Sequence, residues 1–296
     1  MSPSTHLRRS LLYVPGDRMV MLVKAADRGA DGLILNLEDA VEPASKELAR
    51  QTVTRALQTL DFGPAEVIVR INPLDTADGY RDLLALIPAG PHVILLPKVG
   101  SAEAVRFAAW TIGRLEEIHG LPAGRIALMA MIESATGVLA AAEIAACHPL
   151  VAALIFGAND LATELECAAY PAGRPLLHAA SQLILAAAAA GVDAIDSPHM
   201  KLGDPEGLAA SSRLARELGF DGKTAIHPEQ IAAINAAFSP SAEQVAWARR
   251  VVELLHGDDA TPLGAALLDG QLIEAPHLAR ARRVLAVGEK VGAYYI

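Results

Sequence analysis

Five charged residues follow strand-like apolar runs of this chain, where an enzyme could use them together. The runs read LILNLEDAV, VIVRIN, LMAMIES and LIFGANDL, and the charged residues are Glu38, Asp39, Arg70, Glu133 and Asp160. In a barrel of parallel strands, side chains distant in sequence meet at the rim formed by the carboxyl ends of the strands. Carboxylates with one arginine and no obvious nucleophile suggest a divalent metal and an oxyanion. That combination indicates chemistry through an enolate.

The two later carboxylates, Glu133 and Asp160, follow consecutive strand-like runs and would be neighbours on such a rim. Two carboxylates that face one cavity repel each other unless a cation or a proton lies between them. Mg²⁺ binds one or two protein carboxylates and keeps positions for water and substrate oxygens. The pair therefore predicts a magnesium site. The alternative is that both residues are helix caps or ion-pair partners.

Arg70 ends its run, and a buried guanidinium at a barrel mouth needs an anion to face. Its fork suits a substrate carboxylate or a developing enolate oxygen. A structural pair with Glu38 or Asp39 is the alternative, and both can hold at once. Glu38 and Asp39 could hold metal-bound waters, orient Arg70, or neutralise Lys98.

Other catalytic signatures are weak or missing. Lys98 could form a Schiff base, but a nearby metal site makes that aldolase chemistry less favoured. His199 and His227 each stand beside a proline, where we predict structural roles. The sequence contains no P-loop, no H-E-x-x-H, no G-x-S-x-G and no paired C-x-x-C.

Eight strand-like runs alternate with amphipathic segments and would position these residues. They are aliphatic without strict alternation, as expected of strands buried on both faces. Helix start signals include Asp17 before a helix opening at Arg18, and Asp204 before Pro205. We predict an α/β protein with a (β/α)8 TIM-type barrel over residues 1–238, and an open doubly wound sheet is the alternative. The runs cover 11–15, 32–37, 66–71, 92–98, 125–132, 151–156, 192–196 and 223–228.

Residues 239–296 exceed what a barrel needs. Their pattern predicts a helix, then a loop or short hairpin, then a final helix from about Ala275. We expect this C-terminal helical extension to act as a lid, an oligomer contact, or both.

Composition narrows the class of protein. The chain has 296 residues, a hydrophobic content of 52% and a net charge of −9, which argues against nucleic acid as a partner. No signal-type core opens the chain and no apolar stretch reaches the roughly twenty residues of a membrane span. Cys147 and Cys167 fit two buried thiols in a reducing compartment. We predict a soluble cytoplasmic protein with no membrane partner.

Motifs along nearly the whole chain resemble one enzyme family. They read RSLLYVPGDR, ILNLEDAV, VRIN, LLPKV, MIES, FGANDL, DGKTAIHPEQ and DGQLIEAPHLARAR. The chain resembles the citrate lyase β-subunit-like group of the HpcH/HpaI aldolase/citrate lyase family, which includes malyl-CoA and citramalyl-CoA lyases. The resemblance implies that Glu133 and Asp160 bind Mg²⁺ and that Arg70 stabilises the enolate. It also implies that Glu38 and Asp39 organise metal-bound waters.

The same resemblance implies a homotrimer in which each C-terminal segment closes over a neighbour's active site. That segment typically delivers an Asp, but here GQLIEAP places Glu274 there. Glutamate is one methylene longer, so either the lid lies further back or the reaction differs, and Asp269 is a second candidate. The resemblance also suggests that CoA lies near the first barrel loop, with Arg18 and Lys24 as phosphate contacts. Ordinary surface charge is the alternative for these two.

The resulting prediction is a Mg²⁺-dependent carbon–carbon lyase. Its substrate would be a 3-hydroxy-3-carboxyacyl-CoA-type thioester such as malyl-CoA, citramalyl-CoA or a citryl thioester. The products would be a 2-oxo acid and an acyl thioester. The alternatives are a malyl-CoA-type thioesterase, a CoA-independent 2-oxo acid aldolase, and a β subunit that acts only within a multi-protein citrate lyase.

Overall fold

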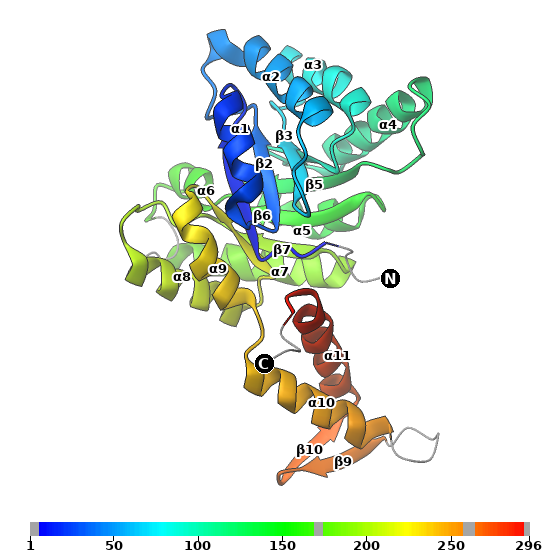
Figure 1. The fold of residues 1–296 in the computed structure, drawn as a ribbon, viewed down its shortest axis with the longest axis vertical. Helices are drawn as coiled ribbons and strands as arrows, with labels where there is room; N and C mark the ends of the chain where they lie inside the picture. Colours follow the sequence, from blue (N-terminus) through cyan, green and yellow to red (C-terminus); the bar gives the residue numbers. More distant parts are fainter. Residues whose placement is uncertain (1–5, 169–173, 257–263, 293–296) are drawn as a thin grey trace. The chain divides into compact units, whose positions relative to one another are not determined.

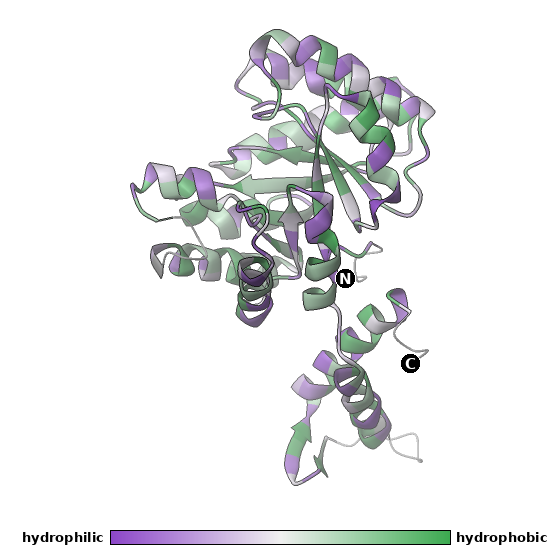
Figure 2. Ribbon diagram, turned by 60° about the vertical axis from the view of Figure 1, so that its left-hand side comes forward, coloured by the Kyte–Doolittle hydropathy of each residue, from purple (hydrophilic) through white to green (hydrophobic). Residues whose placement is uncertain are grey.

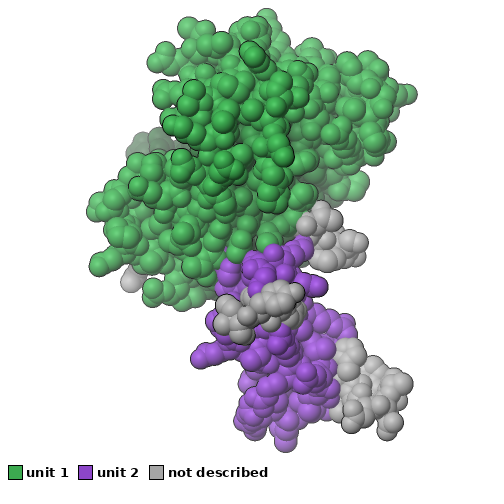
Figure 3. Space-filling model, in the orientation of Figure 1, with its two compact units in different colours: residues 1–237 green, residues 238–296 purple. Residues whose placement is uncertain are grey.

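The computed structural model describes residues 6–168, 174–256 and 264–292. The chain forms two compact units, Met1–Ala237 and Phe238–Ile296, which Figure 3 colours separately. Each unit has its own apolar core and is described by itself below.

The first unit is a closed barrel of eight parallel strands in sequential order (Figure 1). The predicted TIM-type fold is therefore confirmed. Every strand pairs with its neighbours in the chain, and β8 pairs with β1 to close the barrel. The strands are β1 (Ser10–Pro15), β2 (Gly32–Asn36), β3 (Glu66–Arg70), β4 (Val93–Leu96), β5 (Ala127–Ile132), β6 (Val151–Phe156), β7 (Asp193–Asp196) and β8 (Gly222–Ala225).

Helices connect these strands and cover the barrel. The α-helices up to the unit boundary are α1 (Met19–Ala25), α2 (Lys46–Thr59), α3 (Ala77–Leu86), α4 (Ala102–Ile118), α5 (Ala135–Ala146), α6 (Ala158–Glu164), α7 (Leu177–Ala190), α8 (Pro205–Leu218) and α9 (Ile231–Phe238). Short 3-10 helices are η1 (Ala26–Arg28), η2 (Pro43–Ser45), η3 (Ile87–Ala89), η4 (Arg174–Leu176) and η5 (Pro228–Gln230).

Helix boundaries follow local chemistry, with one prediction corrected. Asp204 caps α8 by accepting a hydrogen bond from the Gly207 amide, as the sequence predicted. Helix α1, in contrast, begins at Met19, and Arg18 rather than Asp17 takes the N-cap position without a side-chain cap bond. An acidic residue before a helix signals its start only to within a residue or two.

Aliphatic side chains fill the barrel interior, and Figure 2 shows apolar colour along the strands beside mixed colours on the helices. Tyr13 and Ala127 pack against this core. The interior residues are Leu11, Ile34, Ile68, Val93, Leu95, Met129, Met131, Ala153, Ile155 and Ile195. The barrel is therefore a packed core, and its chemistry must lie at a rim.

A buried arginine, Arg8, links two strands at the rim formed by their amino ends. Arg8 donates two hydrogen bonds of 2.7 Å to Glu66 and one of 2.7 Å to Asp193. Glu66 opens β3 and Asp193 opens β7. At this rim the three charges therefore contact one another.

The second unit packs two helices with a hairpin. They are α10 (Ala242–His256), β9 (Ala265–Leu268), β10 (Gln271–Glu274) and α11 (Ala275–Lys290). The hairpin turns at Asp269 and Gly270, whose φ angles of 50° and 81° suit a two-residue turn. Its core consists of Ala248, Val251, Leu255, Ile273 and Ala281. The predicted hairpin and the final helix from Ala275 are thus present.

Two further findings concern the predictions about membrane spans and about the cysteines. In the described residues, none of the helices combines the length and apolar character needed to cross a membrane. Cys147 and Cys167 are free thiols, and both are half-buried rather than buried as predicted.

Candidate active site

Side chains from four neighbouring strands meet at the rim formed by the carboxyl ends. Arg70 Nη1 lies 2.9 Å from Glu38 Oε2, and Lys98 Nζ lies 3.1 Å from Glu38 Oε1. The Lys98 amide donates to Glu133 Oε1 at 2.6 Å. Glu38 follows β2, Arg70 ends β3, Lys98 follows β4 and Glu133 follows β5. The structure thus brings together four of the residues selected from the sequence.

The Arg70 guanidinium is held on several sides and is almost fully buried. Its Nε donates to Asn36 Oδ1 at 2.8 Å, beside the ion pair with Glu38. Its Cζ lies 5.0 Å from the centre of the Tyr13 ring, which places a cation over an aromatic face. Asn36 also accepts a hydrogen bond from the Glu38 amide at 3.0 Å. Both the predicted structural pair with Glu38 and a guanidinium near the rim are therefore present.

Lys98 connects the two buried glutamates through an unusual backbone conformation. Its φ of 52° lies in the left-handed region of backbone conformation, which residues other than glycine rarely adopt. That conformation lets the amide reach Glu133 while the ammonium reaches Glu38. Strained backbone of this kind is concentrated at functional sites.

Glu133 is buried beside a second carboxylate. The pKa of Glu133 is raised to about 8, chiefly by burial and then by the nearby charges of Asp160 and Glu38, while the Lys98 amide and the Arg70 charge oppose the shift. Gly157 makes room for this side chain, because an added Cβ would lie 2.3 Å from Glu133 Cβ and 2.9 Å from Oε2. Asp160 lies in the first turn of α6, just after Gly157, and is exposed.

The donor set fits a divalent cation. The four carboxylates predicted for the site are accompanied by three basic side chains, Arg70, Lys98 and Lys46, which leaves one negative charge in excess when all are ionised. Both Glu38 oxygens are buried and neither has a well-aligned hydrogen-bond donor among the described residues. Water molecules bound to a cation could donate to them. The part of the chain that the structure describes has no cluster of three or more His, Cys, Asp or Glu side chains suited to a metal, so a site here would combine two carboxylates with water.

Burial raises the pKa of the Glu38 carboxyl, and the Arg70 charge opposes that effect. Asp39 lies at the edge of the same cluster, 3.8 Å from both Arg70 Nη1 and Lys98 Nζ, and its side chain is 56% exposed. At such distances in water-like surroundings its interactions are weak. Glu38 is therefore the carboxylate that orients Arg70, and Asp39 is a peripheral member.

Arg18 and Lys24 are both exposed on α1. Arg18 stands at the start of the helix, with its side chain 64% exposed and its Nε 3.9 Å from Asp17. Lys24 lies in the last turn, about 9 Å further along the helix axis. Neither belongs to the Glu38–Arg70–Glu133 cluster, so their predicted role toward CoA stays a prediction.

The C-terminal candidates have structural partners within the second unit. Glu274 is the N-cap of α11 in a capping box with His277, whose Nδ1 accepts from the Glu274 amide at 3.1 Å. Asp269 pairs with Arg250 through contacts of 2.7 and 2.8 Å. Glu274 is exposed, and one of its oxygens can cap while the other binds a ligand.

The two histidines differ. His227 Nδ1 accepts from the Glu229 amide at 3.3 Å, which is a structural contact of its side chain. His199 Nε2 is buried 3.4 Å from Asp204 Oδ2 without a hydrogen bond among the described residues, and the His199 backbone carbonyl accepts from Gln230 Nε2 at 2.7 Å. Sequence reasoning overlooked Asn36 and Tyr13. Tyr13 could have been found by alternation, because it lies two residues after the interior Leu11.

Comparisons with known proteins find related enzymes along nearly the whole chain. The family model described as HpcH/HpaI aldolase/citrate lyase matches residues 9–228. A citrate lyase subunit beta from Leuconostoc mesenteroides subsp. cremoris is 38% identical over 279 residues, which is 94% of this chain and 92% of that protein. A (3S)-malyl-CoA thioesterase from Cereibacter sphaeroides is 38% identical over 294 residues, which is 99% of each chain.

Solved structures extend the similarity to the fold. The protein CitE from Mycobacterium tuberculosis, in complex with magnesium, acetoacetate and coenzyme A, has a TM-score of 0.77 and 35% identity. That match covers 96% of this chain and 99% of the other. The citrate lyase beta subunit from M. tuberculosis, complexed with oxaloacetate and magnesium, has a TM-score of 0.66 and 35% identity, covering 80% of this chain and 98% of the other.

Proposed function

Because the chain belongs to the HpcH/HpaI aldolase/citrate lyase family of enzymes, we propose that it is a Mg²⁺-dependent carbon–carbon lyase of CoA thioesters. Its substrate would be a 3-hydroxy-3-carboxyacyl-CoA of the malyl, citramalyl or citryl type. The observation that carries the proposal is the cluster of Glu38, Arg70 and Glu133 at one rim, with its excess of negative charge. A solved relative is described in complex with magnesium, acetoacetate and coenzyme A, which supports the substrate class.

Each residue would act on a defined part of the substrate. Glu133 and Asp160 would hold Mg²⁺, which when bound supplies a Lewis acid for the hydroxyl and carboxylate oxygens of the substrate. The 3-hydroxyl would give its proton to solvent water, and the bond between C2 and C3 would break. C3 would become the carbonyl carbon of the 2-oxo acid, and the electron pair of the broken bond would pass to the thioester as an enolate. Arg70, held by Glu38 and Asn36, would face the negative oxygen that develops.

The enolate must then take up a proton at its α-carbon. We propose that Glu274 of a neighbouring copy donates it, with Asp269 as the second candidate. Glu274 already caps α11, and we expect its second oxygen to serve the reaction. This role requires an oligomer, for which we propose a homotrimer, and light scattering of the purified protein would measure its mass.

Arg18 and Lys24 are proposed to bind CoA phosphates. A cytoplasmic location stays a prediction.

One observation favours a second function. Identity to the (3S)-malyl-CoA thioesterase equals that to the citrate lyase subunit beta and covers slightly more of this chain. In that reaction water would attack the thioester carbonyl, and the products would be free CoA and a hydroxy diacid. Arg70 could stabilise the oxyanion of either reaction.

A product assay decides between the two functions. The purified chain is incubated with Mg²⁺ and each of malyl-CoA, citramalyl-CoA and citryl-CoA. A lyase releases a 2-oxo acid without free thiol, whereas a thioesterase releases free thiol without a 2-oxo acid. Glu133→Gln provides the control, because it removes a proposed metal ligand. If neither product forms with any thioester, the proposal is wrong.

A further inference from the structure

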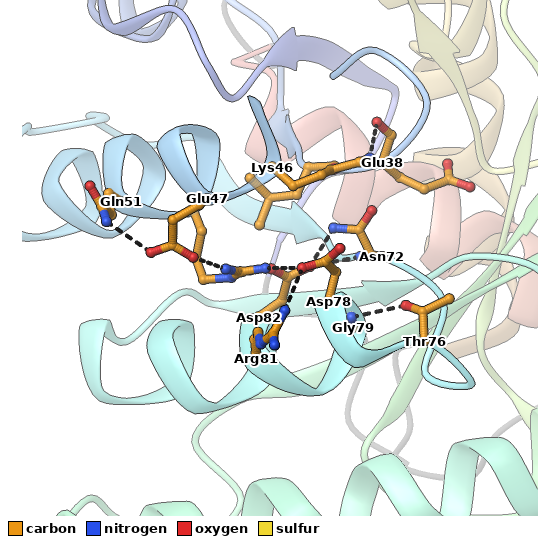
Figure 4. Close-up of polar contacts among 12 residues, drawn as sticks. Glu38, Lys46, Glu47, Gln51, Asn72, Thr76, Asp78, Gly79, Arg81 and Asp82 are labelled. Carbon is orange, nitrogen blue, oxygen red and sulfur yellow. Dashed lines mark hydrogen bonds and ion pairs between the residues drawn. The ribbon is translucent and has the colours of Figure 1, made fainter. Parts of the chain in front are cut away.

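Helix α2 carries two basic side chains that belong to neither the proposed metal ligands nor the proposed substrate contacts. Lys46 opens the helix and Arg50 follows one turn later, so the two lie on the same face. Lys46 bonds to the Glu38 carbonyl, and Arg50 bonds to Asp82, which holds Asn72; Figure 4 labels Lys46, Glu38, Asn72 and Asp82. These residues lie in or hold the loops that follow β2 and β3.

Lys46 holds the backbone of the Glu38 loop. Its Nζ donates to the Leu37 carbonyl and to the Glu38 carbonyl, each at 2.8 Å (Figure 4). Hydrogen bonds from an ammonium are shorter and stronger than neutral ones. The Leu37 amide in turn donates to the Arg70 carbonyl at 2.9 Å. The loop that presents the Glu38 carboxylate is therefore fixed from α2 on one side and from β3 on the other.

Arg50 holds the loop after β3 through one intermediate. Its Nε donates to Asp82 Oδ1 at 2.7 Å, and its Nη2 donates to Asp78 Oδ1 at 2.9 Å. Asp82 Oδ2 accepts from the Asn72 amide at 2.9 Å and from Asn72 Nδ2 at 2.7 Å. Asn72 stands two residues after Arg70, and Asp82 is fully buried. Arg50 thus neutralises the carboxylate that fixes the end of the Arg70 strand.

Close packing leaves this second loop little freedom. A Cβ at Gly79, in the first turn of α3, would lie 2.2 Å from the Pro73 carbonyl oxygen and 2.6 Å from the Asn72 carbonyl oxygen. The helix backbone therefore presses directly on the loop that Asp82 holds. A movement of α2 or α3 would therefore be transmitted to the loop that follows β3.

We propose that Lys46 and Arg50 are positioning residues that set the Glu38 carboxylate against the Arg70 guanidinium. The 2.9 Å contact between Arg70 and Glu38 joins the end of β3 to the loop that follows β2. Helix α2 holds that loop directly through Lys46, and it holds the residues that follow Arg70 through Arg50 and Asp82. The catalytic consequence rests on the proposed function, whereas the structural consequence does not. The two are tested separately.

The first test measures kinetics with the best of the three thioesters. Lys46→Met is expected to lower kcat by about 10- to 100-fold, the usual effect of removing an outer partner of a site, with a much smaller change in KM. Lys46→Arg, which keeps donors for the two carbonyls, should restore most of the turnover. Arg50→Lys should restore little, because a point charge cannot span Asp78 and Asp82. Arg55→Gln removes an exposed charge from the same helix and should keep the wild-type kcat.

A purely structural role would give a different pattern, with a lower thermal midpoint but a normal kcat for the folded enzyme. If folded Lys46→Met retains the wild-type kcat, the positioning role is overturned. Should Lys46→Met fail to fold, the kcat values of Lys46→Arg and Arg50→Lys still decide the question.

The second test needs no substrate. Amide hydrogen exchange should become faster at Leu37 in Lys46→Met and at Asn72 in Arg50→Lys. The amides of β6 and β7, on the opposite side of the barrel, should stay protected. If the wild-type protein cleaves no thioester, the proposed function fails. The exchange measurement still tests whether Lys46 and Arg50 hold the two segments. Unchanged protection of Leu37 and Asn72 in both variants would overturn the inference.

Discussion

Adding one methyl group at Gly157 should disable the candidate metal site without unfolding the barrel. A Cβ there would lie 2.3 Å from Glu133 Cβ and 2.9 Å from Glu133 Oε2, closer than packed atoms tolerate. Gly157 has a φ of −97°, so alanine meets no backbone strain and the effect is purely one of space. Glu133 cannot yield freely, because its other oxygen accepts from the Lys98 amide at 2.6 Å.

The magnitude follows from the cost of overpacking, which is about 1–3 kcal/mol. If this cost falls on the geometry that binds the cation, Mg²⁺ affinity should drop roughly 5- to 140-fold. Isothermal titration of Gly157→Ala with MgCl₂ measures the affinity directly. Turnover of the thioester at subsaturating Mg²⁺ should fall by a similar factor.

Gly113→Ala is the matched control. Gly113 lies within α4, and nothing lies within 4 Å of an added Cβ. Alanine should stabilise that helix by about 1 kcal/mol and leave Mg²⁺ binding unchanged. Wild-type Mg²⁺ affinity in Gly157→Ala would refute the assignment of the metal to Glu133 and Asp160 as a pair, because the clash displaces either the Glu133 side chain or α6, which carries Asp160.

Three further predictions test the charges. Burial raises the pKa of Glu133 to about 8, so below pH 8 Mg²⁺ must displace a proton from this carboxyl. The affinity for Mg²⁺ should therefore rise by about tenfold per pH unit up to pH 8 and level off above it. Titrations that show equal Mg²⁺ affinity at pH 6 and pH 8 would contradict this. Arg70→Met should lower kcat by about 10²–10³ with little loss of Mg²⁺ binding, and near-normal turnover would exclude its assigned role. Arg8→Met should destabilise the barrel by about 3–5 kcal/mol in chemical denaturation, because Glu66 keeps a buried charge without its partner; an unchanged unfolding midpoint would show that the pair contributes nothing.

Much of the barrel could be predicted because its signals are local. Most strands are short aliphatic runs, and the turn into a helix such as α8 is marked by a capping residue, Asp204, and by a proline. Parallel strands share one direction, so residues that end consecutive runs must lie at one rim. That argument placed Arg70 and Glu133 correctly at the same rim without any knowledge of distances.

The parts that the sequence did not predict depend on contacts between segments. The left-handed backbone at Lys98 has no local signature, because no glycine or asparagine marks the position. Asn36 reads as an ordinary strand residue until its oxygen is seen to accept from Arg70 at 2.8 Å. Lys46 reads as a surface lysine at a helix start, yet it holds two carbonyls of the Glu38 loop. In each case the role depends on a partner that sequence spacing does not specify.

The two buried glutamates of the site differ in a way that only their surroundings explain. Glu38 lies between two cations, Arg70 at 2.9 Å and Lys98 at 3.1 Å, so its charge is balanced within the protein. Glu133 is equally buried, but it receives one amide hydrogen bond and faces the like charge of Asp160. An ionised carboxylate in that position is unfavourable until a cation arrives. The imbalance therefore favours Glu133 as the residue that recruits the metal and Glu38 as the residue that keeps Arg70 aimed at the substrate.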